Sequence, residues 1–341
     1  MQNKITIADK LLNEDGNLKH KGYSTELLLE YDRNDIKAPK WRIKEWDYYL
    51  IYNKDYAIAL TIADNSYMGL VTASFIDLNN KWEKTLSKMF WFSNGKVNLP
   101  ASSKSGVTKK DGKGYSCKFE VLENKRTLDC HIENFYNDKP FTAHFELLDE
   151  PKDSMVIATP FEKKKHFYYN QKIVGFKAIG TVDFDGKTFD FKDDTLALLD
   201  WGRGVWTYSN TWYWGAGSAY IDNQIIGFNL GYGFGDTSAA SENMIFIDGK
   251  HIKLEDITFD IPKNEKGKDD FLSPWKIYSS DKSFDTTFTP TINRHSNTNA
   301  LIIQSNQNQV FGLLNGVANV EGNKIEFKDF PCFFEKVINR W

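Results

Sequence analysis

The feature that most constrains this chain is a short-range alternation of apolar and polar residues that begins at Trp46. Tyr48, Leu50 and Tyr52 form one apolar side, and the alternation resumes at residues 57–62 after the polar turn 53–55. A period of two places every second side chain on the same face of an extended strand. The pattern therefore predicts a β-hairpin and favours strands over helices.

The same pattern recurs along most of the chain, separated by turn-forming residue pairs. The other predicted strands cover residues 66–78, 115–122, 127–135, 141–148, 172–184, 212–222 and 224–234. The turn pairs include Asn94-Gly95, Asp111-Gly112, Asp185-Gly186, Asp222-Asn223, Asp248-Gly249 and Glu321-Gly322. Asn, Asp and Gly adopt the backbone conformations that tight hairpins require. Helical periodicity is weak and is confined to residues 27–31 and 83–90.

The length and composition indicate an all-β protein in two parts. A chain of 341 residues exceeds the size at which a single core usually keeps growing. Its aromatic content of 15% favours pleated surfaces. The polar segment 150–165 contains two prolines and a charged run, so we expect one antiparallel β-barrel or sandwich domain in residues 1–160 and another in residues 161–341.

Charge and hydropathy exclude several classes of partner. The net charge is −3 and the basic residues are interspersed with acidic ones, so we expect no nucleic-acid binding. No stretch has the roughly 20 apolar residues that a membrane span needs. The first ten residues lack the pattern of a signal peptide. We therefore expect a cytoplasmic protein whose partner is a small-molecule ligand or substrate.

No motif predicts a metal or a cofactor. The three cysteines lack CxxC spacing, and the six histidines show neither HxxxH nor HExxH spacing. The run GYGFGD does not have the glycine spacing of a dinucleotide site. We expect free, buried thiols and neither metal nor cofactor.

The candidate site lies in residues 196–243, where aromatic residues and glycines are concentrated. Four of the ten tryptophans occur between positions 201 and 214. Trp212 and Trp214 share one strand face, so they predict an aromatic wall. On the next predicted strand, Asn229 is the only polar side chain of a face otherwise rich in glycine. Glycine inside a strand commonly marks close approach by a ligand or another backbone.

Charged residues near these aromatics supply candidate catalytic groups. Asp200 and Arg203 bracket a Trp-Gly pair, and Asp236 and Glu242 follow the glycine-rich strand. A carboxylic acid held among aromatic rings is suited to general acid catalysis. The structural alternative is an ion pair between Asp200 and Arg203 that holds a turn, with the tryptophans forming a sandwich core.

His166 is a further catalytic candidate because it begins a predicted strand near the same region. The predicted substrate contacts are aromatic or amide side chains, namely Asn170, Trp201, Trp206, Tyr208, Trp212, Trp214 and Asn229.

Several segments that extend over almost the whole chain form a recognisable set, namely LLNEDGNLKHKGYS, WRIKEWDYY, IALTIADNSYMG, NLPASSKSG, FYYNQKI, LLDWGRGVWTYSNTWYWGAGS and GFNLGYGFGDTSAASENMIFIDGK. Together they resemble a bacterial family known as domain of unknown function 2804. The family has no agreed activity, so the resemblance informs the fold more than the function.

A more distant resemblance is to the lipocalin-like superfamily of carotenoid hydratases, kievitone hydratase and related cyclases. Asp200 matches the acid of the D-H-E-W-G motif, and Trp212 and Trp214 match its later aromatic pair. The resemblance implies two lipocalin-like β domains that bind an apolar substrate. The histidine of that motif is absent here, with Trp201 in its neighbourhood.

Three functions remain open from the sequence. The first is a cofactor-independent enzyme of the hydratase, dehydratase or isomerase type, in which Asp200 transfers a proton and Arg203 orients it or binds an oxyanion. The second is a glycoside hydrolase that uses two of Asp200, Asp236 and Glu242. The third is a protein that binds an apolar or glycosidic metabolite without transforming it.

Overall fold

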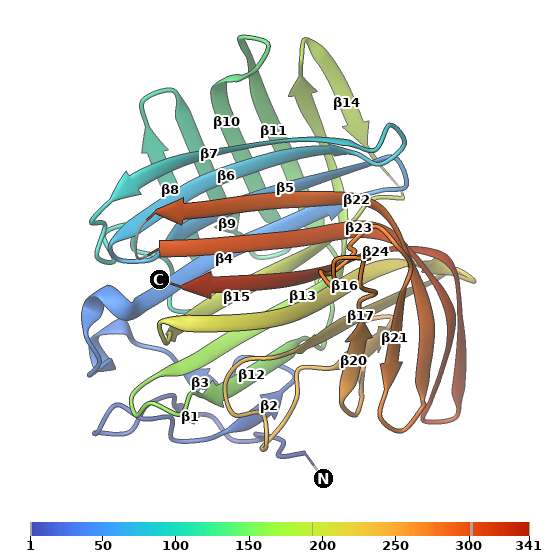
Figure 1. Cartoon of the computed structure of the whole chain (residues 1–341). Helices are drawn as coiled ribbons and strands as arrows, with labels where there is room; N and C mark the ends of the chain where they lie inside the picture. Colours follow the sequence, from blue (N-terminus) through green and yellow to red (C-terminus); the bar gives the residue numbers. More distant parts are fainter. Residues whose placement is uncertain (1, 193, 301–302, 341) are drawn as a thin grey trace.

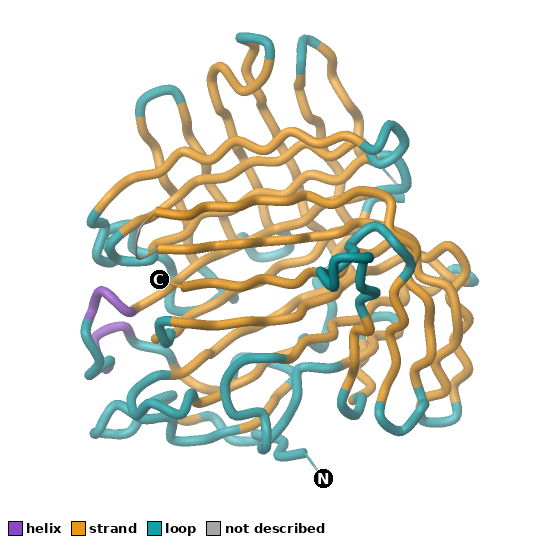
Figure 2. Tube along the Cα trace, viewed as in Figure 1, coloured by secondary structure: helices purple, strands orange, loops and turns teal. Residues whose placement is uncertain are grey.

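The computed structural model describes residues 2–192, 194–300 and 303–340, and it is all-β (Figures 1 and 2). Two short 3-10 turns, Arg33–Asp35 and Lys40–Arg42, precede the first long strand. No α-helix occurs in the described ranges. The all-β class predicted from the alternation is confirmed.

The first large sheet is antiparallel and curls on itself. Its main path within the described residues runs β7-β6-β5-β4-β15-β13-β11-β10-β9-β8, while β12 and β14 pair with β13, and β2 pairs with β12. The strands are β2 (Gly22–Ser24), β4 (Ile43–Tyr52), β5 (Tyr56–Asp64), β6 (Met68–Asp77), β7 (Trp82–Trp91), β8 (Gly106–Gly112), β9 (Tyr115–Val121), β10 (Arg126–Tyr136), β11 (Lys139–Leu148), β12 (Met155–Pro160), β13 (Phe167–Phe184), β14 (Lys187–Phe191) and β15 (Leu196–Val205).

The second large sheet is also antiparallel, and its order in the described residues is β19-β18-β17-β16-β24-β23-β22-β21-β20. The strands are β16 (Ser209–Ile221), β17 (Gln224–Tyr232), β18 (Met244–Ile247), β19 (Lys250–Lys253), β20 (Ile257–Asp260), β21 (Trp275–Ser279), β22 (Phe284–Ala300), β23 (Ile303–Val320) and β24 (Asn323–Arg340). A short parallel pair, β1 (Asp9–Lys10) and β3 (Leu29–Glu30), lies near the N-terminus.

The predicted hairpins form where the sequence places them. Residues 48–62 build β4 and β5, and Asp222 and Asn223 adopt positive φ in the turn between β16 and β17. The weak helical pattern at residues 83–90 is instead part of strand β7, and residues 27–31 contain β3. Pairing of β7 with β6 along its whole length overrides the local preference.

The chain does not pass from one sheet to the other at the boundary predicted between residues 160 and 161. The strands on either side of that position, β12 and β13, pair with each other in the first sheet. The charged run 162–165 is therefore a connection within the first sheet. The chain passes to the second sheet at residues 206–208, between β15 and β16.

The two sheets pack against each other, so the molecule has three groups of buried apolar residues. One lies within the curl of the first sheet and another within the curl of the second. The third joins residues of both sheets, such as Leu198 and Val174 of the first with Ala216 and Phe333 of the second.

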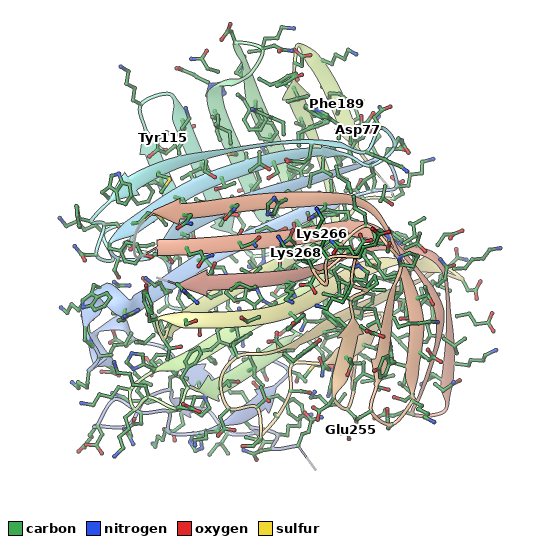
Figure 3. The ribbon with its side chains drawn as sticks, viewed as in Figure 1. Asp77, Tyr115, Phe189, Glu255, Lys266 and Lys268 are labelled. Carbon is green, nitrogen blue, oxygen red and sulfur yellow. The ribbon has the colours of Figure 1, made fainter. Side chains whose placement is uncertain are left out.

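The long strands of the second sheet extend across the first sheet (Figure 1). Arg294 of β22 donates a hydrogen bond of 2.7 Å to Ser74 of β6. The polar loop between β20 and β21, which carries Lys266 and Lys268, lies against the outer side of β24, where Asp269 binds Lys336 at 2.6 Å (Figure 3).

Tyr52 of β4 makes a central polar contact between the sheets. Its hydroxyl lies 2.8 Å from the Ser218 hydroxyl and also accepts a hydrogen bond from the Ser218 backbone N–H. Both side chains are buried.

We predict that Tyr52→Phe lowers the free energy of unfolding by about 1–2 kcal/mol, because it removes this hydroxyl and leaves buried polar groups of Ser218 without a partner. Urea denaturation measures the change. Tyr220→Phe, at an exposed position of the same strand as Ser218, is the matched control and should change stability by less than about 0.5 kcal/mol. Equal effects of the two substitutions would contradict a special role for the Tyr52 contact.

Candidate functional site

A row of polar side chains lies on the face of the first sheet that meets the second. Asp200 of β15 is the register partner of Lys172 in β13 and of Tyr48 in β4, so the three side chains project to the same side. Lys172 Nζ lies 2.8 Å from Asp200 Oδ1. Asn170 Nδ2 donates to the same oxygen at 2.6 Å. The row therefore contains a buried ion pair that is hydrogen-bonded from one side.

The second sheet covers this ion pair with an aromatic ring. The Lys172 ammonium lies 4.1 Å from the centre of the Trp214 ring. Trp214 Nε1 donates to Asn229 Oδ1 at 2.8 Å, and Asn229 Nδ2 donates to the backbone carbonyl of Glu242 at 2.8 Å. The tryptophan is thus held over the cation by an amide that is itself anchored.

Glu335 of β24 brings a second carboxyl group to the same region. Trp212 Nε1 donates to its Oε1 at 2.8 Å, and Gln309 Nε2 donates to its Oε2 at 3.2 Å. Gln309 Nε2 also lies 3.3 Å from the Tyr48 hydroxyl. This network links strands β4, β16, β23 and β24 across the two sheets.

We call these residues together the inter-sheet polar cluster. It comprises Tyr48, Tyr168, Asn170, Lys172, Asp200, Trp212, Trp214, Asn229, Glu242, Gln309 and Glu335.

Burial shifts the protonation of the acidic groups in the cluster. It raises the pKa of Glu335 to about 7, although the Trp212 hydrogen bond and the charge of Lys172 oppose the shift. Burial also raises the pKa of Glu242, against the charge of Lys172. The pKa of Tyr48 rises to about 12 for the same reason. Glu335 is therefore poised to exchange a proton near neutral pH.

The glycine-rich face of β17 contacts protein, which differs from the ligand interpretation of that pattern. A Cβ at Gly231 would lie 2.7 Å from the carboxyl carbon of Glu242, and one at Gly227 would lie 2.9 Å from Val174 Cγ1 of the first sheet. These glycines let a loop and the opposing sheet approach closely. Asn229, on the same face, is fully buried within the cluster.

The structure brings together half of the residues singled out from the sequence. Asp200, Glu242, Asn170, Asn229, Trp212 and Trp214 all belong to the inter-sheet polar cluster. Trp206 lies beside it in an aromatic group, with its ring 5.4 Å from Phe234 and 5.4 Å from Trp212 between ring centres.

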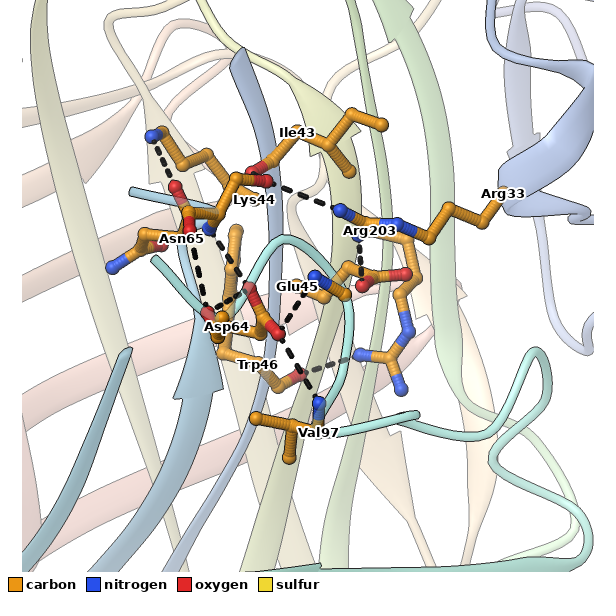
Figure 4. Close-up of polar contacts among 12 residues, drawn as sticks. Arg33, Ile43, Lys44, Glu45, Trp46, Asp64, Asn65, Val97 and Arg203 are labelled. Carbon is orange, nitrogen blue, oxygen red and sulfur yellow. Dashed lines mark hydrogen bonds and ion pairs between the residues drawn. The ribbon is translucent and has the colours of Figure 1, made fainter. Parts of the chain in front are cut away.

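Arg203 and Trp201 project to the opposite face of β15, because they are an odd number of residues from Asp200. Arg203 donates to the backbone carbonyl of Trp46 (Figure 4). It also donates to the backbone carbonyl of Pro100 and pairs with Asp47 at 3.0 Å. Its guanidinium lies 4.3 Å from the centre of the Trp201 ring, inside the core of the first sheet. Arg203 therefore does not contact Asp200, and neither the predicted orienting role nor the structural Asp200–Arg203 pair follows from this geometry.

The three other predicted residues lie outside the cluster. Asp236 is exposed and accepts a hydrogen bond from the backbone N–H of Ser238. His166 is buried in the connection between β12 and β13, where its Nδ1 lies 3.0 Å from the carbonyl of Lys164, and burial lowers its pKa. Tyr208 is 44% exposed.

The sequence interpretation missed Lys172, Glu335 and Gln309. Lys172 and Glu335 each interrupt an apolar strand segment, Lys172 before Ile173 and Val174, and Glu335 after Phe333 and Phe334. A charged residue in such a segment is rarely left buried without a partner. That signal could have identified both as members of a buried polar site.

An apolar cleft of about 320 Å³ lies next to the cluster, between the two sheets. Its inner walls include Leu50, Ala216, Phe311 and Phe333. Each of these wall residues lies two positions along its strand from a member of the cluster: Leu50 from Tyr48, Ala216 from Trp214, Phe311 from Gln309 and Phe333 from Glu335. Residues two apart on a strand share a face and lie about 7 Å apart, so the cleft ends close to the polar cluster.

No group of three His, Cys, Asp or Glu side chains among the described residues is arranged to hold a metal ion. The three cysteines are free and buried. Within the described ranges, no helix is long and apolar enough to cross a membrane.

Comparison with solved structures shows a similar overall fold. A protein from Nitrosomonas europaea, described as a candidate AttH, superposes with a TM-score of 0.51 at 10% identity, over 90% of this chain and 96% of that chain. Kievitone hydratase from Nectria haematococca gives a TM-score of 0.47 at 11% identity, over 97% and 98% of the two chains. No curated protein matches this sequence. The family model named Domain of unknown function (DUF2804) matches residues 2–341, and the chain therefore belongs to the DUF2804 family.

Proposed function

We propose that this protein is a cofactor-independent enzyme that transfers protons to and from a small apolar metabolite at the inter-sheet polar cluster, as a hydratase, dehydratase or isomerase does. The observation that carries the proposal is Glu335, a buried carboxyl group whose pKa is raised to about 7, which feels the charge of Lys172 and lies two residues along β24 from Phe333 in the wall of the apolar cleft. Such a group can donate and accept a proton at physiological pH.

Glu335 is the proton donor in this proposal. Trp212 and Gln309 each donate to one of its oxygens, so the carboxyl group has a defined orientation. In hydration, its proton would add to one carbon of a carbon–carbon double bond. Water would then form the C–O bond at the other carbon and return a proton to the Glu335 carboxylate. Dehydration runs through the same steps in reverse.

Lys172 and Asp200 have a positioning and electrostatic role. Asp200 Oδ1 accepts a hydrogen bond from Asn170 and lies 2.8 Å from the Lys172 ammonium, so this oxygen is engaged in holding the cation. Lys172 presents a fixed positive charge that can stabilise an oxygen on which negative charge develops. We therefore assign the proton transfer to Glu335 and not to Asp200. The role of Asp200 is to hold Lys172 in position.

Glycoside hydrolysis is the second candidate, and the grouping of carboxyl groups favours it. Asp200 is an electrostatic neighbour of both Glu242 and Glu335, and tryptophan rings border the same site. Glycosidases use two carboxyl groups, one as an acid and one as a nucleophile or base. Asp236 has no place in this pair because it is exposed outside the cluster.

A reaction in D₂O tests the proposed chemistry. Purified protein is incubated with a panel of apolar metabolites that carry alkenes, hydroxyl groups or glycosidic bonds, and the products are analysed by mass spectrometry. We expect a gain or loss of water, or incorporation of deuterium at carbon. Glu335→Gln should lower the rate at least about a hundredfold, because it removes the titrating group while keeping the side-chain shape.

The matched control is Glu326→Gln, which changes an exposed carboxylate on the same strand and should leave the rate within about twofold. Release of a sugar would contradict the hydratase proposal and favour a glycosidase. Binding of a panel compound without any change of its mass would indicate a binding protein. Equal reaction rates for Glu335→Gln and the wild type would contradict the role of Glu335 as proton donor.

The raised pKa of Glu335 also predicts a pH-dependent stability. Between its ordinary value of 4.5 and about 7, the folded chain keeps the proton on Glu335 while the unfolded chain has lost it. The stabilising contribution of this group is therefore complete below pH 4.5 and is lost as the pH rises to about 7. Relative to Glu335→Gln, the free energy of unfolding of the wild type should fall by roughly 2–3 kcal/mol across this window.

Urea denaturation of both proteins at several pH values between 4 and 8 measures this difference. Glu326→Gln, measured in the same way, should show no such loss between pH 4.5 and 7. A difference between wild type and Glu335→Gln that stays constant with pH would contradict a raised pKa at Glu335.

A further inference from the structure

We infer that the apolar cleft binds an amphipathic carboxylate, with its hydrocarbon chain between the two sheets and its carboxylate at Lys54. The reaction at the buried end of the bound hydrocarbon rests on the proposed function. The binding of the ligand rests on the cleft alone.

Small residues and strand irregularities keep the cleft open. Ala57, Ala216 and Gly312 line it, where larger side chains would fill the space between the sheets. Thr291 also lines the cleft, and it lies at the point where the register between β22 and β23 shifts. Bulges of this kind occur beside functional sites because they redirect a side chain. The volume of about 320 Å³ is at the small end of the range for small-molecule sites.

The interior of the cleft is uncharged. Its deep walls are aliphatic and aromatic side chains, with the buried thiol of Cys332 and the hydroxyls of Tyr52 and Thr291 as its polar groups. The Tyr52 hydroxyl is already bonded to Ser218. Such walls favour a hydrocarbon chain and disfavour a charged or sugar-like body, whose polar groups would lose their hydration.

The charged residues of the cleft lie at its exposed mouth. Lys54 forms no ion pair among the described residues, whereas the two nearby acids have hydrogen-bond donors of their own. Asp329 Oδ1 accepts from Asn315 Nδ2 at 3.2 Å, and Asp55 Oδ1 accepts from Asn79 Nδ2 at 2.9 Å. Lys54 is the one cation among the described residues that line the cleft, so it is the group at the mouth that can bind a negatively charged ligand.

The two ends of the cleft set the geometry of the substrate. Lys54 is four positions from Leu50 in the inner wall, a separation of at most about 13 Å in extended chain. A ligand anchored at Lys54 therefore places carbons far from its carboxylate next to the polar cluster. The substrate class is an unsaturated or hydroxylated carboxylic acid that reacts at a position remote from its carboxyl group.

Calorimetric titration with decanoate and with the uncharged decan-1-ol tests the inference. We expect the wild type to bind decanoate more tightly than decan-1-ol. Lys54→Gln should weaken decanoate binding about three- to tenfold and remove the preference over the alcohol, because the loss is that of one partly exposed ion pair. Lys250→Gln, at the exposed first residue of β19, is the matched control and should leave both affinities unchanged.

Ala216→Leu tests the cleft itself, because the larger side chain fills it without removing a polar group. We expect at least a tenfold loss of binding for both probes and an unchanged or higher melting temperature. No binding to the wild type at millimolar decanoate, unchanged affinities in Ala216→Leu, or equal affinity for acid and alcohol would each overturn the inference. If Ala216→Leu does not fold, the Lys54→Gln result decides alone.

The same titration separates this inference from the proposed function. Decanoate binding by the wild type, with no proton transfer by the wild type on any compound of the panel, would overturn the proposed function alone. Proton transfer on uncharged substrates, with no binding of decanoate, would overturn the carboxylate assignment alone.

Discussion

The buried ion pair between Lys172 and Asp200 is the interaction on which the arrangement of the two sheets depends. An ammonium removed from water is costly unless it is paired and hydrogen-bonded. Asp200 supplies the charge, Asn170 binds that carboxylate from the side, and Trp214 of the second sheet covers the cation. The second sheet therefore presents this aromatic face at this position, and Glu335 of β24 comes close enough to Lys172 for the charge of Lys172 to act on its carboxyl group.

Strand β15 separates two polar networks that are neighbours in sequence. Its alternation directs Asp200 toward the second sheet and Arg203 into the core of the first, where Arg203 binds Asp47 and three backbone carbonyls. The network around Arg203 stabilises the first sheet internally and does not line the cleft. The network around Asp200 lies between the sheets, beside the apolar cleft, so a substrate can be bound near Glu335, whose pKa is raised.

Much of the site could be predicted because it is concentrated in one stretch of sequence. The residue types and the alternation of this stretch indicate Asp200, Trp212, Trp214, Asn229 and Glu242. Lys172 and Glu335 come from strands distant in sequence, and only the pairing of β13 with β15 and of β16 with β24 brings them in. The glycines of β17 predict the approach of a ligand, but they accommodate Glu242 and Val174, because a missing Cβ leaves room without indicating what fills it.

The sequence by itself determined the all-β class, the positions of most hairpins and the family, since a period of two and turn-forming pairs are local properties of the chain. It did not determine where one sheet ends, because the charged run at residues 162–165 has the composition of a linker and yet joins two paired strands. Only the tertiary structure decided which carboxyl group shares a face with which cation, where the cleft lies and how deeply Glu335 is buried. These properties depend on the packing of one sheet against the other, and no local pattern records that packing.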